Sequence, residues 1–258
     1  MDVVIAPVGE LAKVAADEIQ ALLESKPDAV IGLATGSSPL PIYDELARRH
    51  KEDGLSFAQA QGFQLDEYVG IAADHPERYR NVIEKEIASR VDWPADQVHG
   101  PDGNAKDLAL ACAEYEGAIK AAGGVDLQIL GIGSDGHIAF NEPGSSFASR
   151  TRVGVLTEQT REDNARFFDN DISKVPTLCL TQGLGTIMEA RELVLIATGA
   201  GKAEAIRQLV EGAVSARWPA TIIQHHPHAL ILVDEDAASK LELKDYYRES
   251  WAKRALLK

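Results

Sequence analysis

Acidic and imidazole side chains gather in the middle of the chain, directly after an apolar run at residues 125–130. Asp135, His137 and Glu142 fall within eight positions, among closely spaced glycines. A histidine beside carboxylates can move protons, because its unperturbed pKa of about 6.5 lies near neutrality. An ordinary turn with three solvated side chains is the alternative. Proton-carrying groups and flexible backbone after a buried strand favour the catalytic edge of an α/β sheet.

A second acidic pair, Asp66-Glu67, follows the strand-like residues 63–65 and enters a polar loop that runs to residue 75. Such a pair can act as a base, bind a metal or cap the next helix. The next predicted helix begins near Tyr79, which is too distant for Asp66 to cap it. The position therefore favours catalysis.

Two glycine-rich turns could hold an anion. Thr35-Gly36-Ser37-Ser38 joins an apolar strand to a helix, a geometry that directs free N–H groups at a phosphate monoester. It is neither a Walker loop nor a GxGxxG turn, and a plain connection is the alternative. Gly199-Ala200-Gly201-Lys202 places a lysine at the start of another helix, where an anion site and a surface lysine are equally compatible with the sequence.

Strand-like and helix-like segments alternate around these motifs. Apolar runs predict strands at 3–6, 29–34, 63–65, 125–130, 177–180, 192–197 and 229–233. Helical spacing predicts helices near 10–26, 40–46, 79–91, 107–121, 158–168, 183–190, 202–210 and 246–257. This alternation is typical of a doubly wound, mostly parallel, Rossmann-like sheet flanked by helices. We expect one α/β domain over residues 1–258.

Composition limits the classes of partner. The chain has 258 residues and a formal net charge of −14, which argues against a nucleic-acid surface. It shows no basic N-terminal region and no apolar run of the ~18–20 residues that a membrane span needs. Cys112 and Cys179 match no metal spacing and fit reduced thiols in a cytoplasm. His225-His226-Pro227-His228 lacks the spacing of a zinc motif, so we predict no metal there.

These motifs together closely resemble those of the glucosamine-6-phosphate deaminase (isomerase) family. The most specific match is Asp-Gly-His-Ile-Ala-Phe-Asn-Glu-Pro at residues 135–143. The likeness covers nearly the whole chain and includes the blocks at 33–39, 65–70, 149–152, 164–168 and 199–202. The related 6-phosphogluconolactonases share a looser Gly-x-Asp-Gly-His element.

The resemblance implies conversion of glucosamine 6-phosphate and water to fructose 6-phosphate and ammonia, without a cofactor or a metal. It implies that Asp66 is the base that carries a proton between C2 and C1. His137 would open the pyranose ring, with Asp135 and Glu142 holding its imidazole and setting its charge. We expect this imidazole to titrate near neutrality.

The resemblance also implies the remaining binding residues. Thr35, Gly36, Ser37 and Ser38 would hold the phosphate, with charge from Arg166 and Lys202, beneath a lid over roughly 156–179. Some members are activated by N-acetylglucosamine 6-phosphate through a serine, an arginine and a lysine. Here Ser145 and Arg152 are in place, but Gly154 stands at the lysine position, so we expect weak or absent activation. The family varies in assembly, which leaves a homo-oligomer open.

Three other interpretations remain. His137 could activate water in a sugar-phosphate lactonase, or the chain could be a non-catalytic domain that senses sugar phosphates. The presence of Asp66, Asp135, His137 and Glu142 together disfavours the sensor. A divalent metal on Asp135, His137 and Glu142 is the third, although a proton relay explains the same residues. The motifs do not distinguish glucosamine from galactosamine 6-phosphate.

Overall fold

The computed structural model describes residues 1–256, and its centre is a seven-stranded sheet in which all pairs are parallel. The strand order is β1-β10-β9-β6-β2-β3-β5. Central strands are buried on both faces, which explains their continuous apolar runs. The strands are β1 (Asp2–Ile5), β2 (Val30–Leu33), β3 (Gln61–Gln64), β5 (Val98–His99), β6 (Leu127–Leu130), β9 (Glu192–Ala197) and β10 (Ala229–Val233).

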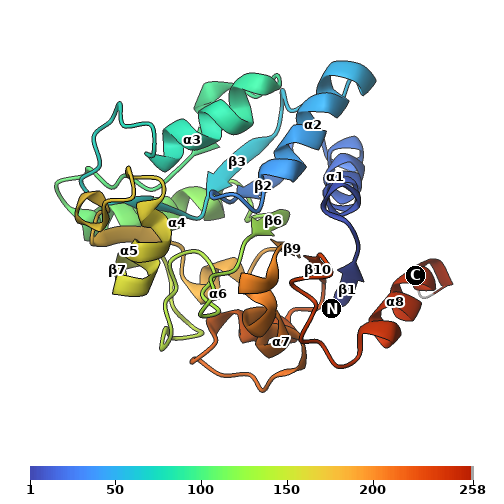
Figure 1. Ribbon diagram of the computed structural model, residues 1–258. Helices are drawn as coiled ribbons and strands as arrows, with labels where there is room; N and C mark the ends of the chain where they lie inside the picture. The colour runs from blue at the N-terminus through green and yellow to red at the C-terminus, as the bar shows by residue number, and fades with distance from the viewer. Residues whose placement is uncertain (257–258) are drawn as a thin grey trace.

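Helices cover both faces of this sheet (Figure 1). One face carries α1 (Val8–Ser25), α2 (Leu40–Asp53) and α3 (Tyr79–Glu86), and the other carries α6 (Leu184–Ile187) and α7 (Ala203–Glu211). At the flanks, α4 (Leu108–Ala121) packs against β7 (Arg152–Val155), which belongs to a second sheet, and α8 (Lys244–Ala252) packs against β1. The predicted doubly wound α/β fold is confirmed.

The second sheet was not predicted. The strands β4 (Asp66–Tyr68), β8 (Leu178–Thr181) and β7 (Arg152–Val155) form an antiparallel sheet in the order β4-β8-β7. The expectation that Asp66-Glu67 enters a polar loop is therefore wrong, because both residues pair with β8 before the loop begins. A three-residue strand with two acidic residues shows no apolar pattern, so only its tertiary pairing reveals it.

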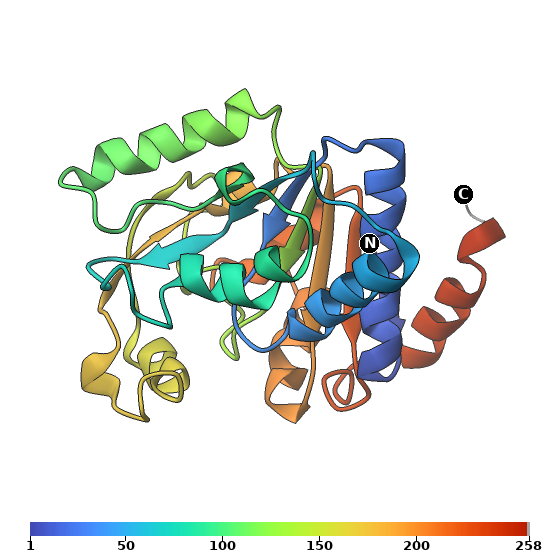
Figure 2. The same ribbon diagram turned by 90° about the horizontal axis from the view of Figure 1, so that it is seen from above.

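The segment between β7 and β8 packs on a small core of its own. This segment contains α5 (Glu158–Ala165) and η3 (Ile172–Lys174), and it lies on the side of the molecule opposite α8 (Figures 1 and 2). Its buried side chains join a cluster separate from the main core: Tyr68, Ile71, Phe140, Leu156, Ala165, Phe168, Val175 and Cys179. The predicted helix 158–168 ends earlier, at Ala165.

Other helix boundaries differ modestly from prediction. The helix expected at 79–91 is α3 followed by the short η1 (Ala88–Arg90). The helix expected at 246–257 is α8 followed by η6 (Arg254–Leu256), and Leu257 lies outside the described residues. The remaining short helices are η2 (Ala95–Gln97), η4 (Ala200–Lys202) and η5 (Pro219–His225). Over residues 1–256, no helix has the length and apolarity required to cross a bilayer.

The strand order reverses between β2 and β6, which are neighbours in the sheet. From β2 the chain continues outward to β3 and β5, and from β6 it continues in the other direction to β9 and β10. Such a reversal leaves a crevice at the carboxyl ends of the two strands. The Thr35–Ser38 turn and the Asp135–His137 turn both follow these ends, so the topology brings two distant motifs together.

Candidate active site

A cavity of about 530 Å³ lies at this crevice. Its walls come from the turn after β2, the turn after β6, strand β4 and the segment around α5. It collects most of the predicted site residues: Thr35, Gly36, Ser37, Ser38, Asp66, His137, Arg166 and Lys202. The other two, Asp135 and Glu142, contact His137 instead of lining the cavity. The structure thus brings all the predicted residues to one place.

His137 is held by two carboxylates on the same ring nitrogen. Its Nδ1 lies 2.8 Å from Asp135 Oδ1 and 3.6 Å from Glu142 Oε2, as ion pairs without an aligned hydrogen bond. Asp135 Oδ1 also accepts the backbone N–H of His137 at 3.1 Å. A Cβ at Gly133 would lie 2.3 Å from the imidazole, so only glycine leaves room for the ring. With Nδ1 turned to the carboxylates, Nε2 is left for the cavity.

The pKa values of His137 and Asp135 differ from those of the free side chains. Burial alone would lower the pKa of His137, but the Asp135 and Glu142 side chains raise it to about 9. Burial would raise the pKa of Asp135, yet contact with His137 lowers it to about 2. The expectation that the imidazole titrates near neutrality is therefore wrong: at pH 7 the ring is an imidazolium and can donate a proton.

Asp66 lies in the wall of the cavity on β4 and is 6% exposed. Burial, and to a smaller extent the charge of Glu67, raise the pKa of its carboxyl to about 8 against the opposing effect of His137. A carboxyl whose pKa is close to the working pH can both take and return a proton. This is the property required of a base that moves one hydrogen between neighbouring carbons.

Other residues of the cavity are suited to an anion. The Thr35–Ser38 turn precedes the first turn of α2, and Gly36 has a positive φ of 87° that favours glycine. Lys202, at the end of η4, and Arg166, after α5, add two cations. Burial lowers the pKa of Lys202, Asp163 opposes this, and Arg166 lowers it further. An anion bound between the two cations would raise the pKa of Lys202 again, because it would favour the charged form of the amine.

Sequence reasoning missed several residues of the cavity. Tyr79, the first residue of α3, lines it, and its hydroxyl donates to the hydroxyl of Tyr68 at 3.1 Å. Asn164 of α5 also lines it and donates to the Tyr68 hydroxyl at 3.0 Å. An aromatic residue at a helix start is equally compatible with a core position, so the sequence offered no specific signal for Tyr79.

His226 and His137 differ in their surroundings. Both ring nitrogens of His226 are used within the fold: Nε2 lies 2.8 Å from the carbonyl of Ala190, and Nδ1 accepts the N–H of His228 at 3.1 Å. Among the described residues, one group of three has ligand atoms within 4.8 Å of one another, namely Asp135, His137 and Glu142. The ion pairs within this group account for its geometry without an ion.

The residues of the expected activator site also lie together. Arg152 donates to Asn141 Oδ1 at 2.7 Å and to the hydroxyl of Ser145 at 3.1 Å. At Gly154 a Cβ would lie 3.0 Å from the sulfur of Cys179, so the thiol occupies the space that a longer residue would enter. No cation from position 154 joins Arg152, and weak or absent activation stays our prediction.

Known proteins resemble the chain over nearly its whole length. A family model described as glucosamine-6-phosphate isomerases/6-phosphogluconolactonase matches residues 6–232. A glucosamine-6-phosphate deaminase of Beutenbergia cavernae is 66% identical over 253 residues, which cover 98% of this chain and 97% of that protein. A glucosamine-6-phosphate deaminase of Mycolicibacterium smegmatis is 65% identical over 252 residues, with 97% of each chain covered.

Solved structures agree with the sequence relatives. A monomeric glucosamine-6-phosphate deaminase matches with a TM-score of 0.90 at 41% identity, covering 93% of this chain and 99% of the other. A 6-phosphogluconolactonase from Trypanosoma cruzi matches with a TM-score of 0.75 at 22% identity, covering 93% and 97%. At this lower identity the likeness shows a shared fold alone.

The ion pair between Asp135 and His137 predicts a change that NMR can measure. Asp135→Asn should lower the pKa of His137 by about one unit or more, because it removes an opposite charge 2.8 Å away. The imidazole Cε1–H resonance, assigned with His137→Gln, would be followed through a pH titration. Glu142→Gln is the control and should cause a smaller shift, since its oxygen is 3.6 Å away. An unchanged His137 pKa in Asp135→Asn would contradict the prediction.

Proposed function

The chain belongs to the family of glucosamine-6-phosphate isomerases and 6-phosphogluconolactonases, and we propose that it converts glucosamine 6-phosphate and water to fructose 6-phosphate and ammonia. The observation that carries this proposal is that Asp66 and His137 face one cavity whose other part holds two cations. The relatives at 65–66% identity are deaminases of this substrate by name. The chain is thus an enzyme whose residues can be assigned to steps.

His137 serves the ring-opening step. Its Nε2 faces the cavity as part of an imidazolium and donates a proton to the ring oxygen O5 as the C1–O5 bond breaks. The neutral ring then accepts the proton of the O1 hydroxyl, which becomes the aldehyde oxygen. Asp135 and Glu142 stabilise the charged form before and after this exchange.

Asp66 serves the isomerisation step as a carboxylate. It removes the proton from C2 of the open-chain amino aldehyde while the His137 imidazolium protonates O1, which gives an enol. The ammonium group then gives one proton to the neutral imidazole, and Asp66 returns its proton to C1, so that the C=N bond of a protonated imine forms at C2. Water then adds to this imine, and ammonia leaves. Burial raises the pKa of this carboxyl to about 8, and the ammonium of the substrate would favour its ionised form by attraction.

The phosphate end and the lid complete the proposal. The N–H and hydroxyl groups of the Thr35–Ser38 turn would hold the phosphate between Lys202 and Arg166. Residues 156–179 would act as a lid, because they pack on the separate small core and bring Arg166 to the cavity. No cofactor takes part in this scheme. Both cysteines are free and buried, which is compatible with the cytoplasm that we propose as the location.

Coupled detection of ammonia and fructose 6-phosphate from purified protein tests the proposed function. We expect equal amounts of the two products from glucosamine 6-phosphate, with galactosamine 6-phosphate tested alongside. Hydrolysis of 6-phosphogluconolactone without ammonia release from the amino sugar would overturn the proposal in favour of a lactonase. Binding of the sugar phosphate without turnover would indicate a sensor.

Asp66→Asn should lower kcat by about 10²–10⁴-fold, because an amide cannot accept the C2 proton. The variant should still bind fructose 6-phosphate with wild-type affinity in calorimetry, since the phosphate groups are untouched. Asp74→Asn, at an exposed position of the following loop, is the control and should keep wild-type turnover. Ordinary turnover by Asp66→Asn would remove Asp66 as the base.

Lys202→Ala should raise KM by about 10- to 100-fold, because a charge-assisted hydrogen bond contributes about 1.5–3 kcal/mol. Arg166→Ala should raise KM in the same direction, although Arg166 belongs to the proposed lid. Lys106→Ala removes an exposed lysine outside the cavity and should leave KM unchanged. A wild-type KM in Lys202→Ala would exclude this lysine from the phosphate site. A wild-type KM in Arg166→Ala would exclude a contact between the proposed lid and the phosphate.

A further inference from the structure

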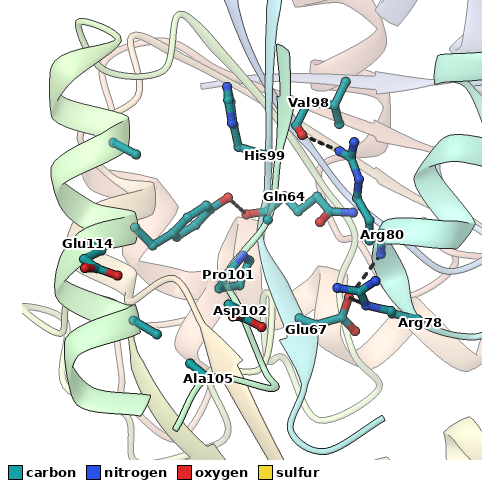
Figure 3. A pocket seen from close by; sticks show the side chains of 14 residues that line it. Gln64, Glu67, Arg78, Arg80, Val98, His99, Pro101, Asp102, Ala105 and Glu114 are labelled. Atoms are coloured by element: carbon teal, nitrogen blue, oxygen red, sulfur yellow. Dashed lines mark hydrogen bonds and ion pairs between the residues drawn. The ribbon is translucent and has the colours of Figure 1, made fainter. Parts of the chain in front are cut away.

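Neighbouring acidic residues on β4 face opposite sides of the small sheet. Side chains alternate along a strand, so Asp66 and Tyr68 point into the substrate cavity while Glu67 points away from it. Glu67 instead lines a second cavity of about 520 Å³, between α4 and the start of α3 (Figure 3). The residue is only 2% exposed. A buried carboxylate outside the active site must be stabilised by the groups around it.

Three backbone N–H groups stabilise the Glu67 carboxylate. Oε1 accepts the N–H of Tyr68 at 2.9 Å and that of Tyr79 at 3.1 Å, and Oε2 accepts the N–H of Arg80 at 3.1 Å. Tyr79 and Arg80 open α3, whose own preceding residue offers no side-chain cap. Burial raises the pKa of the Glu67 carboxyl, and these N–H groups and Arg78 oppose that effect. The ionised form lies at the positive end of a helix dipole. Arg78 Nε lies 4.0 Å from Oε2, and Figure 3 shows the Arg78 side chain beside the Glu67 carboxylate.

These contacts link two elements of the active site, β4 and α3, on the side of β4 that faces away from the substrate cavity. Strand β4 carries Asp66 and Tyr68, and α3 carries Tyr79, which also lines the substrate cavity. Tyr79 and Tyr68 are further linked through their hydroxyls. Because Glu67 bonds to the backbone of both elements, a change in its side chain would alter the spacing between Asp66 and Tyr79.

We propose that Glu67 is a positioning residue: its charge and its hydrogen bonds to β4 and α3 hold Asp66 and Tyr79 in place without contact with the substrate. The inference rests on the proposed function, since Asp66 is the base of that reaction. The proposal assigns a role to a residue that lies outside the substrate cavity. From the sequence motif alone, Glu67 would be taken as a second acidic group beside Asp66 in the reaction.

The charge of Glu67 also acts on Asp66. It raises the pKa of the Asp66 carboxyl, after the larger effect of burial, and His137 opposes it. The other groups that face Asp66 electrostatically are Tyr68, Tyr79, Tyr115 and Cys179. Glu67 itself faces Arg78, and its cavity also holds Arg80, His99, Asp102 and Glu114. Removing the Glu67 charge should therefore lower the pKa of Asp66.

Glu67→Gln tests the proposal, because it keeps the shape of the side chain and removes its charge. We expect kcat for ammonia release to fall by about 10- to 100-fold through misplacement of the base. KM should change little, since the phosphate residues are elsewhere. The acidic limb of the kcat/KM profile should move to lower pH by about half a unit or more. Glu114→Gln, which alters an exposed glutamate of the same cavity, is the control and should match the wild type.

Glu67→Asp separates the effect of geometry from the effect of charge. It also tests the proposal if the Glu67→Gln variant does not fold. A shorter carboxylate keeps the charge but cannot reach all three N–H groups, so kcat should fall while the acidic limb stays at its wild-type pH. Wild-type kcat in either variant would overturn the proposal. A loss of kcat in Glu67→Gln with an unmoved acidic limb would also overturn it, leaving a purely structural role.

The two proposals fail separately. If the wild-type protein releases no ammonia from glucosamine 6-phosphate, the proposed function is wrong whatever the variants do. If the wild type releases ammonia and Glu67→Gln behaves like Glu114→Gln, only the role of Glu67 is wrong.

Discussion

The reversal of strand order between β2 and β6 determines where everything else in the site can lie. Parallel strands expose their carboxyl ends at one edge, and the reversal separates the connections that follow two neighbouring strands. The turn after β2 supplies small residues and backbone N–H groups, while the turn after β6 supplies the imidazole and its carboxylates. The residues proposed for the anion site and those proposed for proton transfer therefore share one crevice.

Electrostatics within the crevice differ from those of the whole chain. The net charge of −14 opposes an anionic substrate, so the proposed phosphate binding relies on the local charges of Lys202 and Arg166 and on the turn after β2. The acidic groups near the cavity are each compensated differently. Asp135 is paired with His137, Glu67 accepts three backbone N–H groups, and Asp66 is buried with a raised pKa. The raised pKa of Asp66, about 8, lets its carboxyl exchange a proton near neutral pH.

The sequence predicted the large sheet, and most of the residues that line its cavity, better than it predicted the small sheet. Strands such as β9 and β10 are continuous apolar runs because helices cover both their faces. By contrast, Asp66–Tyr68 is too short and too polar to show a strand pattern, and Arg152–Val155 has two exposed valines. Their pairing with β8 depends on contacts between distant segments. For the same reason, adjacency in sequence suggested a shared role for Asp66 and Glu67, whereas the pleat of β4 separates them.

The residues that we propose as proton carriers are linked by hydrogen bonds to the segment that contains α5. Glu142, which contacts His137, also accepts the backbone N–H of Thr157, the residue that caps α5. Tyr68, next to Asp66, accepts a hydrogen bond from Asn164 at the other end of that helix. Helix α5 is thus bonded at one end to the imidazole side and at the other to the Asp66 side. A movement of this helix would disturb both walls together, so closure over a substrate and assembly of the proton-transfer groups would be one event.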